Sequence, residues 1–201
     1  MASHVTESLV RLQAELQKLP GIGARSAERI AFHLLKVSTE DASGLAQAIR
    51  DVKTKVRPCS VCYNLTEADP CAICQDPRRD HGQIVVVEQP KDVLALEATE
   101  VVQGVYHVLM GHLAPLDGIE PGDLTIDALV QRVRDGGVKE VVLATNPTME
   151  GDGTAIYIRS LLADLGVTVS RLARGLPTGA QMEYATRAML ADAMEDRKPL
   201  K

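Results

Sequence analysis

Apolar residues recur at two different spacings and divide the chain into a helical first part and an alternating second part. Four leucines near the N-terminus lie three or four residues apart: Leu9, Leu12, Leu16 and Leu19. This spacing predicts an amphipathic helix that ends before Pro20, because proline cannot continue a helix. The same period resumes over residues 24–37 and 39–56. In the last of these stretches the positions expected to point inward are Leu45, Ala48, Ile49 and Val52.

From residue 83 onwards the pattern changes to short β-branched runs separated by helical stretches. The run Gln83-Ile84-Val85-Val86-Val87 is typical of a strand buried on both faces of a parallel sheet. Further strands are predicted at residues 105–110, 138–144 and 167–172, and helices at 92–100, 123–134 and 154–165. This alternation predicts a parallel α/β domain whose strand-to-helix loops meet at one edge of the sheet. A last helical pattern over residues 182–196 predicts a C-terminal helical tail.

The four cysteines of the chain form two Cys-x-x-Cys pairs separated by eight residues: Cys59, Cys62, Cys71 and Cys74. Each pair can direct two thiolates at one centre, and two pairs complete the closed tetrahedral sulfur shell that structural Zn²⁺ prefers. The segment is short, rich in proline and poor in apolar residues, so the metal would supply its folding free energy. Two disulfides or four free thiols are the alternatives, and nothing in the sequence indicates the oxidising compartment that disulfides require.

The first two predicted helices are joined by the tight turn Leu19-Pro20-Gly21-Ile22-Gly23, in which both glycines are free to take positive φ. This arrangement predicts a helix-hairpin-helix. Its turn and the N-terminus of its second helix offer unpaired backbone N–H groups to a phosphate, and nearby basic side chains add charge. The predicted contacts to the DNA backbone are Lys18, Gly21, Gly23, Arg25 and Arg29. A plain antiparallel helix pair is the alternative.

Charge is distributed unevenly along the chain. The net charge of −5 argues against a polyanion-binding surface over the whole molecule, yet residues 1–57 hold nine Lys/Arg against six Asp/Glu, and residues 81–201 hold eleven against seventeen. A mildly basic head that touches phosphates would then be joined to an acidic body that engages protein, with ordinary scatter of charge as the alternative. Arg78 and Arg79, after the second cysteine pair, fit either a DNA contact or a linker.

The composition narrows the function classes further. With 45% hydrophobic and 24% charged residues the chain has an ordinary globular balance, and five aromatic residues without tryptophan argue against a base-stacking platform. No apolar run is long enough to cross a bilayer, and the N-terminal residues do not resemble a secretory signal. We therefore expect no membrane contact and a cytoplasmic, nucleoid-associated protein.

Acidic and polar residues follow the predicted strands at one edge of the sheet. Glu88 and Asp92 follow the first strand, Gly111-His112-Leu113 follows the second, and Glu150 and Asp152 lie in the loop 145–153 after the third. His112 is a further candidate for a partner contact. An acid at the end of a first strand with a polar loop after a later one resembles the Toprim fold of topoisomerases and primases, in which a Glu and an Asp-x-Asp pair hold Mg²⁺.

The expected metal-binding pair is missing here. Glu88 matches the Glu, but the strand end that should supply two aspartates reads Asn146-Pro147-Thr148. One carboxylate with an Asn and a Thr would bind a hard cation weakly, even where Glu150 and Asp152 compensate in part. We expect a degenerate, binding-type Toprim domain without a catalytic site. The alternatives are a Mg²⁺-dependent Toprim nuclease or primase-like enzyme that uses Glu88 with Glu150 or Asp152, and a zinc-dependent transcriptional regulator, for which the hairpin lacks base-reading side chains.

A helix-hairpin-helix, a four-cysteine zinc element and a Toprim-like domain in this order resemble the RecR family of bacterial recombination mediators over nearly the whole chain. The matching runs are residues 19–23 with Ser26-Ala27-Glu28-Arg29, the cysteine set, 108–119, 144–155 and 170–179. Arg25 stands where the family commonly has Lys, which keeps the charge, and Thr186 stands where an Asp is usual. The predicted fold class is multidomain α/β, with a helix-hairpin-helix region at 1–57, a four-cysteine zinc finger at 58–79, a Toprim domain at 80–172 and a C-terminal segment at 173–201.

The resemblance implies a protein without turnover that assembles as a ring-shaped homotetramer and clamps DNA. With RecO it would help RecA replace single-stranded DNA-binding protein (SSB) on single-stranded DNA, and RecF would direct the process to junctions with duplex. In family members the Toprim domain meets RecO, which implies a partner surface along the acidic edge formed by Glu88, Asp92, Glu150 and Asp152. The tail would pack on a neighbouring subunit, and core packing within its own chain is the alternative.

Overall fold

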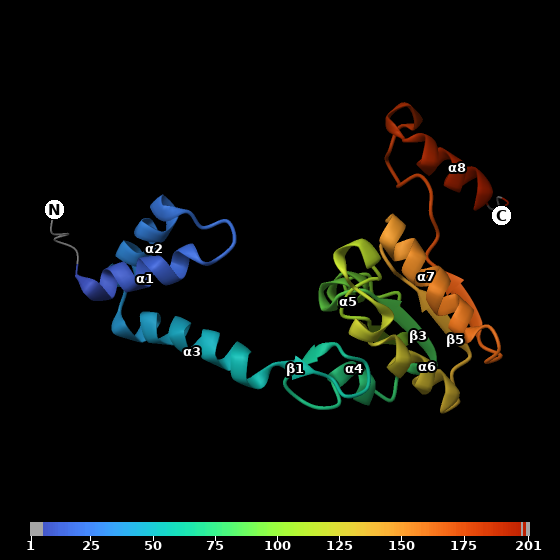
Figure 1. The fold of residues 1–201 in the computed structure, drawn as a ribbon, viewed down its shortest axis with the longest axis horizontal. Helices are drawn as coiled ribbons and strands as arrows, with labels where there is room; N and C mark the ends of the chain where they lie inside the picture. The colour runs from blue at the N-terminus through green and yellow to red at the C-terminus, as the bar shows by residue number, and fades with distance from the viewer. Residues whose placement is uncertain (1–5, 198, 200–201) are drawn as a thin grey trace. The chain divides into compact units, whose positions relative to one another are not determined.

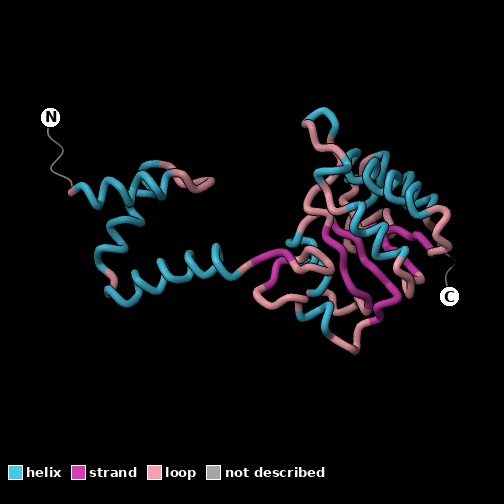
Figure 2. The backbone as a smooth tube through the Cα atoms, turned by 60° about the horizontal axis from the view of Figure 1, so that its bottom comes forward, coloured by secondary structure: helices cyan, strands magenta, loops and turns pink. Residues whose placement is uncertain are grey.

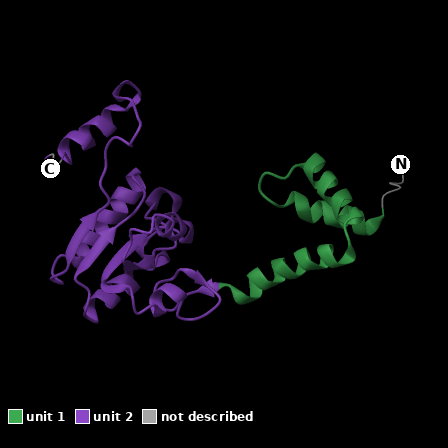
Figure 3. Cartoon of the chain, turned by 180° about the vertical axis from the view of Figure 1, so that it is seen from behind, with its two compact units in different colours: residues 1–56 green, residues 57–201 purple. Residues whose placement is uncertain are grey.

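A computed structural model describes residues 6–197 and 199 of the chain, so that the ends of the predicted terminal segments lie outside the described residues. The chain divides into two compact units, residues 1–56 and 57–201, shown in green and purple in Figure 3. The division falls one residue before the predicted end of the helix-hairpin-helix region. The cysteine segment, the sheet and the C-terminal tail all belong to the second unit.

The described residues of the first unit form three helices, α1 (Glu7–Gln17), α2 (Ala24–Lys36) and α3 (Thr39–Lys55) (Figure 1). α1 ends at the C-cap Lys18, two residues before Pro20, as the sequence predicts. α1 and α2 pack against each other and bury Leu9, Ala27 and Ala31, which are the only buried apolar side chains in the described part of this unit. The core of the first unit is therefore thin.

The apolar face of α3 does not point inward. Leu45, Ile49 and Val52 are 49%, 59% and 61% exposed, and no residue of α3 is buried. The prediction was wrong because it took the helical apolar period as evidence of a core within the same chain, whereas the small core of this unit is formed by α1 and α2 alone. α3 does have an apolar face, but none of the described residues buries it.

The second unit is built on a four-stranded parallel sheet. Its strands are β3 (Asp80–Val87), β4 (Gly104–Val108), β5 (Glu140–Leu143) and β6 (Thr168–Arg171), in the order β4-β3-β5-β6 (Figure 2). β3 pairs with β4 and with β5, and β5 pairs with β6, in parallel register throughout. The structure confirms the predicted parallel α/β domain and each of its strands.

Helices and the cysteine segment cover the two faces of this sheet. Ile84 and Val86 of β3 point into a core closed by α6 (Ile126–Arg134) and α7 (Met149–Leu162). Val85 and Val87 point into a second core, closed by α5 (Pro90–Glu97) and by Ile73 of the short helix α4 (Ala72–Gln75). The alternation of side chains along β3 thus feeds two cores, which explains why its sequence is apolar throughout. Two short 3₁₀ turns, η1 (Pro115–Asp117) and η2 (Pro121–Asp123), connect β4 to α6.

α7 begins five residues earlier than the sequence pattern indicates. Thr148 caps the helix, since its Oγ1 accepts the N–H of Gly151 at 3.0 Å. A Cβ at Gly151 would lie 2.1 Å from the carbonyl oxygen of Asn146, so only glycine permits this approach. The residues predicted as a loop are therefore largely the first turn of α7, and Glu150 and Asp152 lie on a helix. Two glycines concealed the helix because glycine is a weak helix former.

The C-terminal tail contains the 3₁₀ turn η3 (Met182–Tyr184) and the helix α8 (Arg187–Glu195), which confirms the predicted helical tail. Thr186 is the N-cap of α8, and its side chain accepts the N–H of Met189 at 3.3 Å. Threonine and aspartate are both good N-cap residues, which accounts for the Thr at a position where the resemblance leads us to expect Asp. No residue of α8 is buried. Among the described helices, none combines the length and apolar composition needed to cross a membrane.

Candidate functional site

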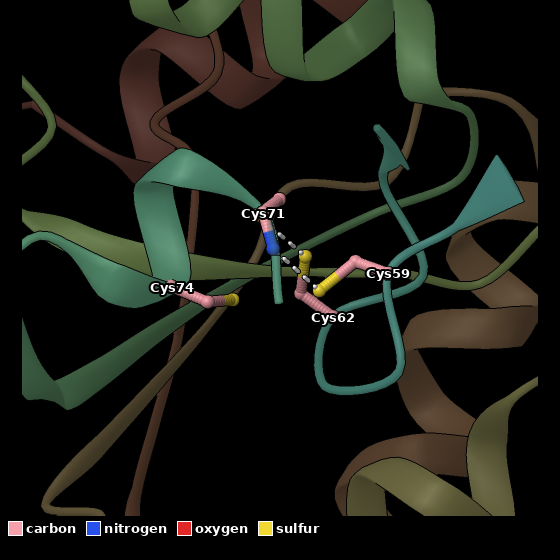
Figure 4. A group of neighbouring side chains, drawn as sticks. All are labelled: Cys59, Cys62, Cys71 and Cys74. Atoms are coloured by element: carbon pink, nitrogen blue, oxygen red, sulfur yellow. Dashed lines mark hydrogen bonds between the residues drawn. The ribbon is translucent and has the colours of Figure 1, made fainter. Parts of the chain in front are cut away.

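The four cysteines converge on one point. A two-residue ladder between β1 (Arg57–Pro58) and β2 (Leu65–Thr66) closes the loop that carries Cys59 and Cys62, while Cys71 is the N-cap of α4 and Cys74 lies within it. Figure 4 shows the four side chains facing a common centre, and their sulfur atoms all lie within 4.8 Å of one another. Three of the four residues are buried.

The chemistry of this cluster calls for a cation. The hydrogen bond with Cys74 lowers the pKa of Cys62 to about 6, while burial raises the pKa of Cys71 to about 11. One thiolate therefore forms readily, and its charge opposes ionisation of the others because like charges at this spacing repel. A central Zn²⁺ with Zn–S bonds of about 2.3 Å places tetrahedral sulfurs about 3.8 Å apart. The 3.5 Å between the Sγ atoms of Cys62 and Cys71 fits that geometry.

The zinc segment packs directly against the sheet through a backbone hydrogen bond and an aromatic contact. The N–H of Val108, at the end of β4, donates to the carbonyl oxygen of Cys62 at 2.8 Å. The ring of Tyr63 meets the ring of His107 edge-on, with centroids 5.4 Å apart. His107 is fully buried, and this burial lowers its pKa to about 4, so the imidazole that Tyr63 contacts is neutral near pH 7.

The hairpin turn in the first unit is open to an approaching phosphate. Gly21 has φ +78°, which disfavours any residue with a Cβ, whereas Gly23 has φ −84° as the N-cap of α2. Only one of the two glycines therefore uses positive φ. Nothing lies within 4 Å of the position of a Cβ at either glycine, and no side chain caps α2. The first N–H groups of α2 have no partner within the helix, so they are available to an anion at this end of α2.

The predicted basic contacts surround the same turn. Lys18, Arg25 and Arg29 are all exposed. Lys18 pairs with Glu15 at 2.8 Å, one turn back on α1. Arg25 and Arg29 are four residues apart on α2 and therefore lie on one face of it. The turn and the two arginines together present backbone donors and positive charge at one end of the helix pair.

Arg78 and Arg79 have different surroundings. The guanidinium of Arg79 is bonded bidentately to Glu97, and it also donates to the carbonyl oxygens of Val102, at 2.9 Å, and Gly104. It ties α5 to the start of β4 and is a structural residue. Arg78 is exposed and pairs with Asp76 at 2.8 Å. Of the two alternatives, the structure favours the structural one for Arg79.

Glu88 lies at the carboxyl end of β3 and is only 3% exposed. Its carboxylate accepts hydrogen bonds from the backbone N–H of Asn146 at 2.7 Å, from Nδ2 of Asn146 at 2.7 Å and from Nδ1 of His112 at 3.2 Å. Both oxygens of Glu88 therefore accept hydrogen bonds from protein donors. Glu88 joins the loops after three strands, and a partner on the surface would meet His112 before it met Glu88.

The other three predicted acids are not gathered into one cluster with Glu88. Asp92 accepts the N–H of Gln89 at 2.8 Å and caps α5. Glu150 is exposed in the first turn of α7. Asp152 forms a bidentate ion pair with Arg174, and this hydrogen bonding lowers the pKa of its carboxyl group. Of the three, only Glu150 offers an exposed carboxylate without an ion pair or cap among the described residues.

Asn146 and Arg174 contribute to this edge although neither was among the predicted site residues. Asn146 supplies two of the three donors to Glu88, and Arg174 neutralises Asp152. The signal for Asn146 was present in the sequence, because it lies two residues after a predicted strand, at the edge where Glu88 lies. No local pattern marks Arg174, which reaches Asp152 across 22 positions of sequence.

Comparison with known proteins agrees with this architecture. Residues 9–53 match the family model for the RecR helix-hairpin-helix, residues 56–76 that for the four-cysteine zinc finger domain of RecR, and residues 82–173 that for the Toprim domain. The predicted structural zinc site, fold class and Toprim domain are thereby confirmed.

Similar proteins extend over the whole chain. "Recombination protein RecR" of Rhodopirellula baltica is 56% identical over 186 residues, which cover 92% of this chain and 94% of that protein. The proteins of the same name from Geobacter sulfurreducens and Koribacter versatilis are 51% and 49% identical, cover 98% of this chain in both cases, and are themselves covered over 99% and 100% of their length. With its hairpin, zinc and Toprim regions all matched in order, this chain belongs to the RecR family of recombination proteins.

Proposed function

We propose that this protein is a recombination mediator that holds DNA by its backbone. With RecO it helps RecA replace SSB on single-stranded DNA, and RecF directs it to junctions with duplex, so that it works in the cytoplasm at the nucleoid. The observation that carries the proposal is the open turn at Gly21 and Gly23, with the free N-terminus of α2 and exposed arginines beside it. Such a surface binds phosphates of any sequence.

The Toprim domain here is part of a RecR protein and not of a nuclease or primase. The surroundings of Glu88 agree with this, since its oxygens accept hydrogen bonds from Asn146 and His112. A mediator that clamps DNA needs no turnover, and the domain then serves as a rigid platform for loops that meet a partner.

The exposed apolar surfaces support assembly into a homotetrameric ring. In the first unit, large apolar side chains are between 45% and 64% exposed on α1, α2 and α3: Val10, Phe32, Leu35, Leu45, Ile49 and Val52. In the tail, Met182 and Met194 are 67% and 64% exposed. Apolar surface of this extent at both ends of a chain marks contacts with other protein, and two self-complementary contacts per chain generate a closed tetramer.

The RecO surface proposed for the Toprim edge is centred on Glu150. Asp92, Asp152 and Glu150 remain its acidic members, with Asp92 engaged in a cap and Asp152 in an ion pair. Glu88 is buried beneath this surface and contributes to it indirectly, because its carboxylate holds His112 and Asn146 in place by hydrogen bonds. A basic partner would be steered to Glu150 by charge.

DNA binding is tested by reversing Arg25→Glu in the full-length, zinc-loaded protein. We expect about tenfold weaker binding to labelled duplex and single-stranded DNA of several sequences, and a salt slope reduced by about one ion for each phosphate that the variant no longer neutralises. Arg11→Glu is the matched control, because Arg11 is exposed on α1 but lies outside the turn. Equal salt slopes for the two variants would contradict the proposed contact.

The partner surface is tested with Glu150→Lys, against Asp164→Lys as an exposed acid that follows the other end of α7. We expect only Glu150→Lys to weaken the complex with RecO in a titration, while DNA binding by the hairpin is retained. An undiminished RecO complex would remove Glu150 from that surface. In a separate test, incubation with gapped DNA and Mg²⁺ should leave every strand at its original length. Shorter or longer strands that are absent with Glu88→Gln would instead support a Mg²⁺-dependent nuclease or primase-like enzyme.

A further inference from the structure

A cleft of about 630 Å³ opens between α7 and the end of the sheet at β6. Asp152, Ile156 and Arg159 line it from α7, the continuous stretch 169–174 lines it from β6 and the residues that follow, and Leu143 lies between them. The cleft therefore lies on the α7 side of the sheet, at the edge strand. We call it the arginine cleft, after Arg159, Arg171 and Arg174.

The arginine cleft carries an excess of positive charge. Arg174 is paired with Asp152, the one acid in the lining. Arg159 and Arg171 are exposed and have no ion pair or side-chain hydrogen bond among the described residues. Two guanidinium groups are thus free to bind an anion, and their N–H groups can donate equally well to carboxylate or phosphate oxygens.

The aliphatic part of the lining favours the carboxylates of a peptide over the phosphates of DNA. Leu143, Ala155, Ile156, Val169 and Leu172 are aliphatic, and no aromatic side chain lines the cleft on which a base could stack. Ile156 and Leu172 are 68% and 44% exposed. A DNA strand would use the arginines and leave the aliphatic wall uncovered, whereas a peptide can place carboxylates on the arginines and aliphatic side chains on the wall.

The backbone of β6 offers a second means of holding a peptide. β6 pairs with β5 along one side only, and no strand pairs with its other side in the described part of the chain. An extended segment can add to such an edge through main-chain hydrogen bonds. We propose that the arginine cleft binds an extended segment of a partner protein in which acidic and aliphatic side chains alternate closely. This site shares none of the proposed DNA contacts, and it borders the proposed RecO surface at Asp152, which lines the cleft, whereas Glu150 does not.

The proposal is tested by selection from a displayed library of random heptapeptides on the full-length, zinc-loaded protein and, in parallel, on the Arg159→Ala/Arg171→Ala variant. Both side chains are exposed, so the variant keeps the fold. We expect acidic, aliphatic peptides to be enriched on the wild-type protein alone. Enrichment of no such class, or of the same class on both proteins, would overturn the proposal.

One enriched peptide is then labelled with fluorescein and titrated by fluorescence anisotropy. We expect binding at least tenfold weaker to the double variant and unchanged for Arg134→Ala, an exposed arginine on α6 outside the cleft. Displacement of the peptide by a short duplex DNA would assign the cleft to phosphates instead. A changed oligomeric state of the double variant in sedimentation would assign it to a second copy of the chain. Either result would overturn the peptide site.

Discussion

Replacing Glu88 by glutamine tests whether the buried carboxylate organises the edge of the sheet. The carboxylate accepts three hydrogen bonds, two from Asn146 and one from His112, while only 3% of the residue is exposed. A hydrogen bond to a charged group contributes about 1.5–3 kcal/mol to stability and a neutral one about 1 kcal/mol. Loss of the charge should therefore cost about 1 kcal/mol for each bond, or about 3 kcal/mol in total for Glu88→Gln.

The assay is urea unfolding of the zinc-loaded protein, followed by far-UV circular dichroism. Glu150→Gln is the control, because Glu150 is exposed on the same edge and a surface change of this kind stays within about 0.5 kcal/mol. The double variant Glu88→Gln/Asn146→Asp should recover about 1 kcal/mol, since the new carboxylate at 146 can accept the new amide at 88. A Glu88→Gln variant as stable as the control would refute the organising role.

The zinc segment, the Arg79 ion pair and the buried His107 can each be perturbed separately. Chelation of zinc, or Cys59→Ser, should unfold the cysteine segment and lower the stability of the sheet it is fastened to, and unchanged circular dichroism and melting after chelation would contradict this. Arg79→Gln should cost about 2–3 kcal/mol, because it leaves Glu97 without its ion pair, whereas Arg78→Gln should leave the stability nearly unchanged because Arg78 is exposed. Equal losses for the two variants in urea unfolding would contradict this. The folded-state pKa of His107 lies at about 4, below its ordinary value of 6.5, so its stabilising effect is complete above pH 6.5 and is lost as the pH falls towards 4. Between pH 6.5 and pH 4 the free energy of unfolding of the wild-type protein should fall by about 3 kcal/mol more than that of His107→Gln. Equal pH dependence of the two proteins would show that His107 does not cause the loss.

Local spacing was sufficient to predict much of the fold. The cysteine pairs fix four ligands because Cys-x-x-Cys turns are self-contained, and Leu19 to Gly23 encode a turn without reference to the rest of the chain. The β-branched run of β3 indicates a strand buried on both faces because that requirement is met residue by residue. Features of this kind depend on neighbours within a few positions.

Other features depend on residues far apart in the sequence, and no local pattern contains them. Glu88 meets Asn146 across 58 positions, and Arg79 meets Glu97 across 18, so their burial and partners emerge only when the strands are placed side by side. The start of α7 was misjudged for the same reason, because Gly151 is required by its approach to Asn146 and not by the helix itself. Periodicity showed that α3 has an apolar face but could not show what covers it.

Because the core of residues 1–56 is thin, the folding of this unit should depend on its association with a second copy, and therefore on the protein concentration. In its described part, residues 6–56, three buried apolar side chains stabilise it from within, while a larger apolar surface remains exposed on its helices. If a second copy covers that surface, the free energy of unfolding rises by about 1.4 kcal/mol for each tenfold increase in free partner above the dissociation constant. The melting temperature of this unit should then increase with protein concentration more steeply than that of residues 57–201, which bury cores of their own. The cellular abundance of the protein would in that case set how much of its DNA-binding end is folded at all.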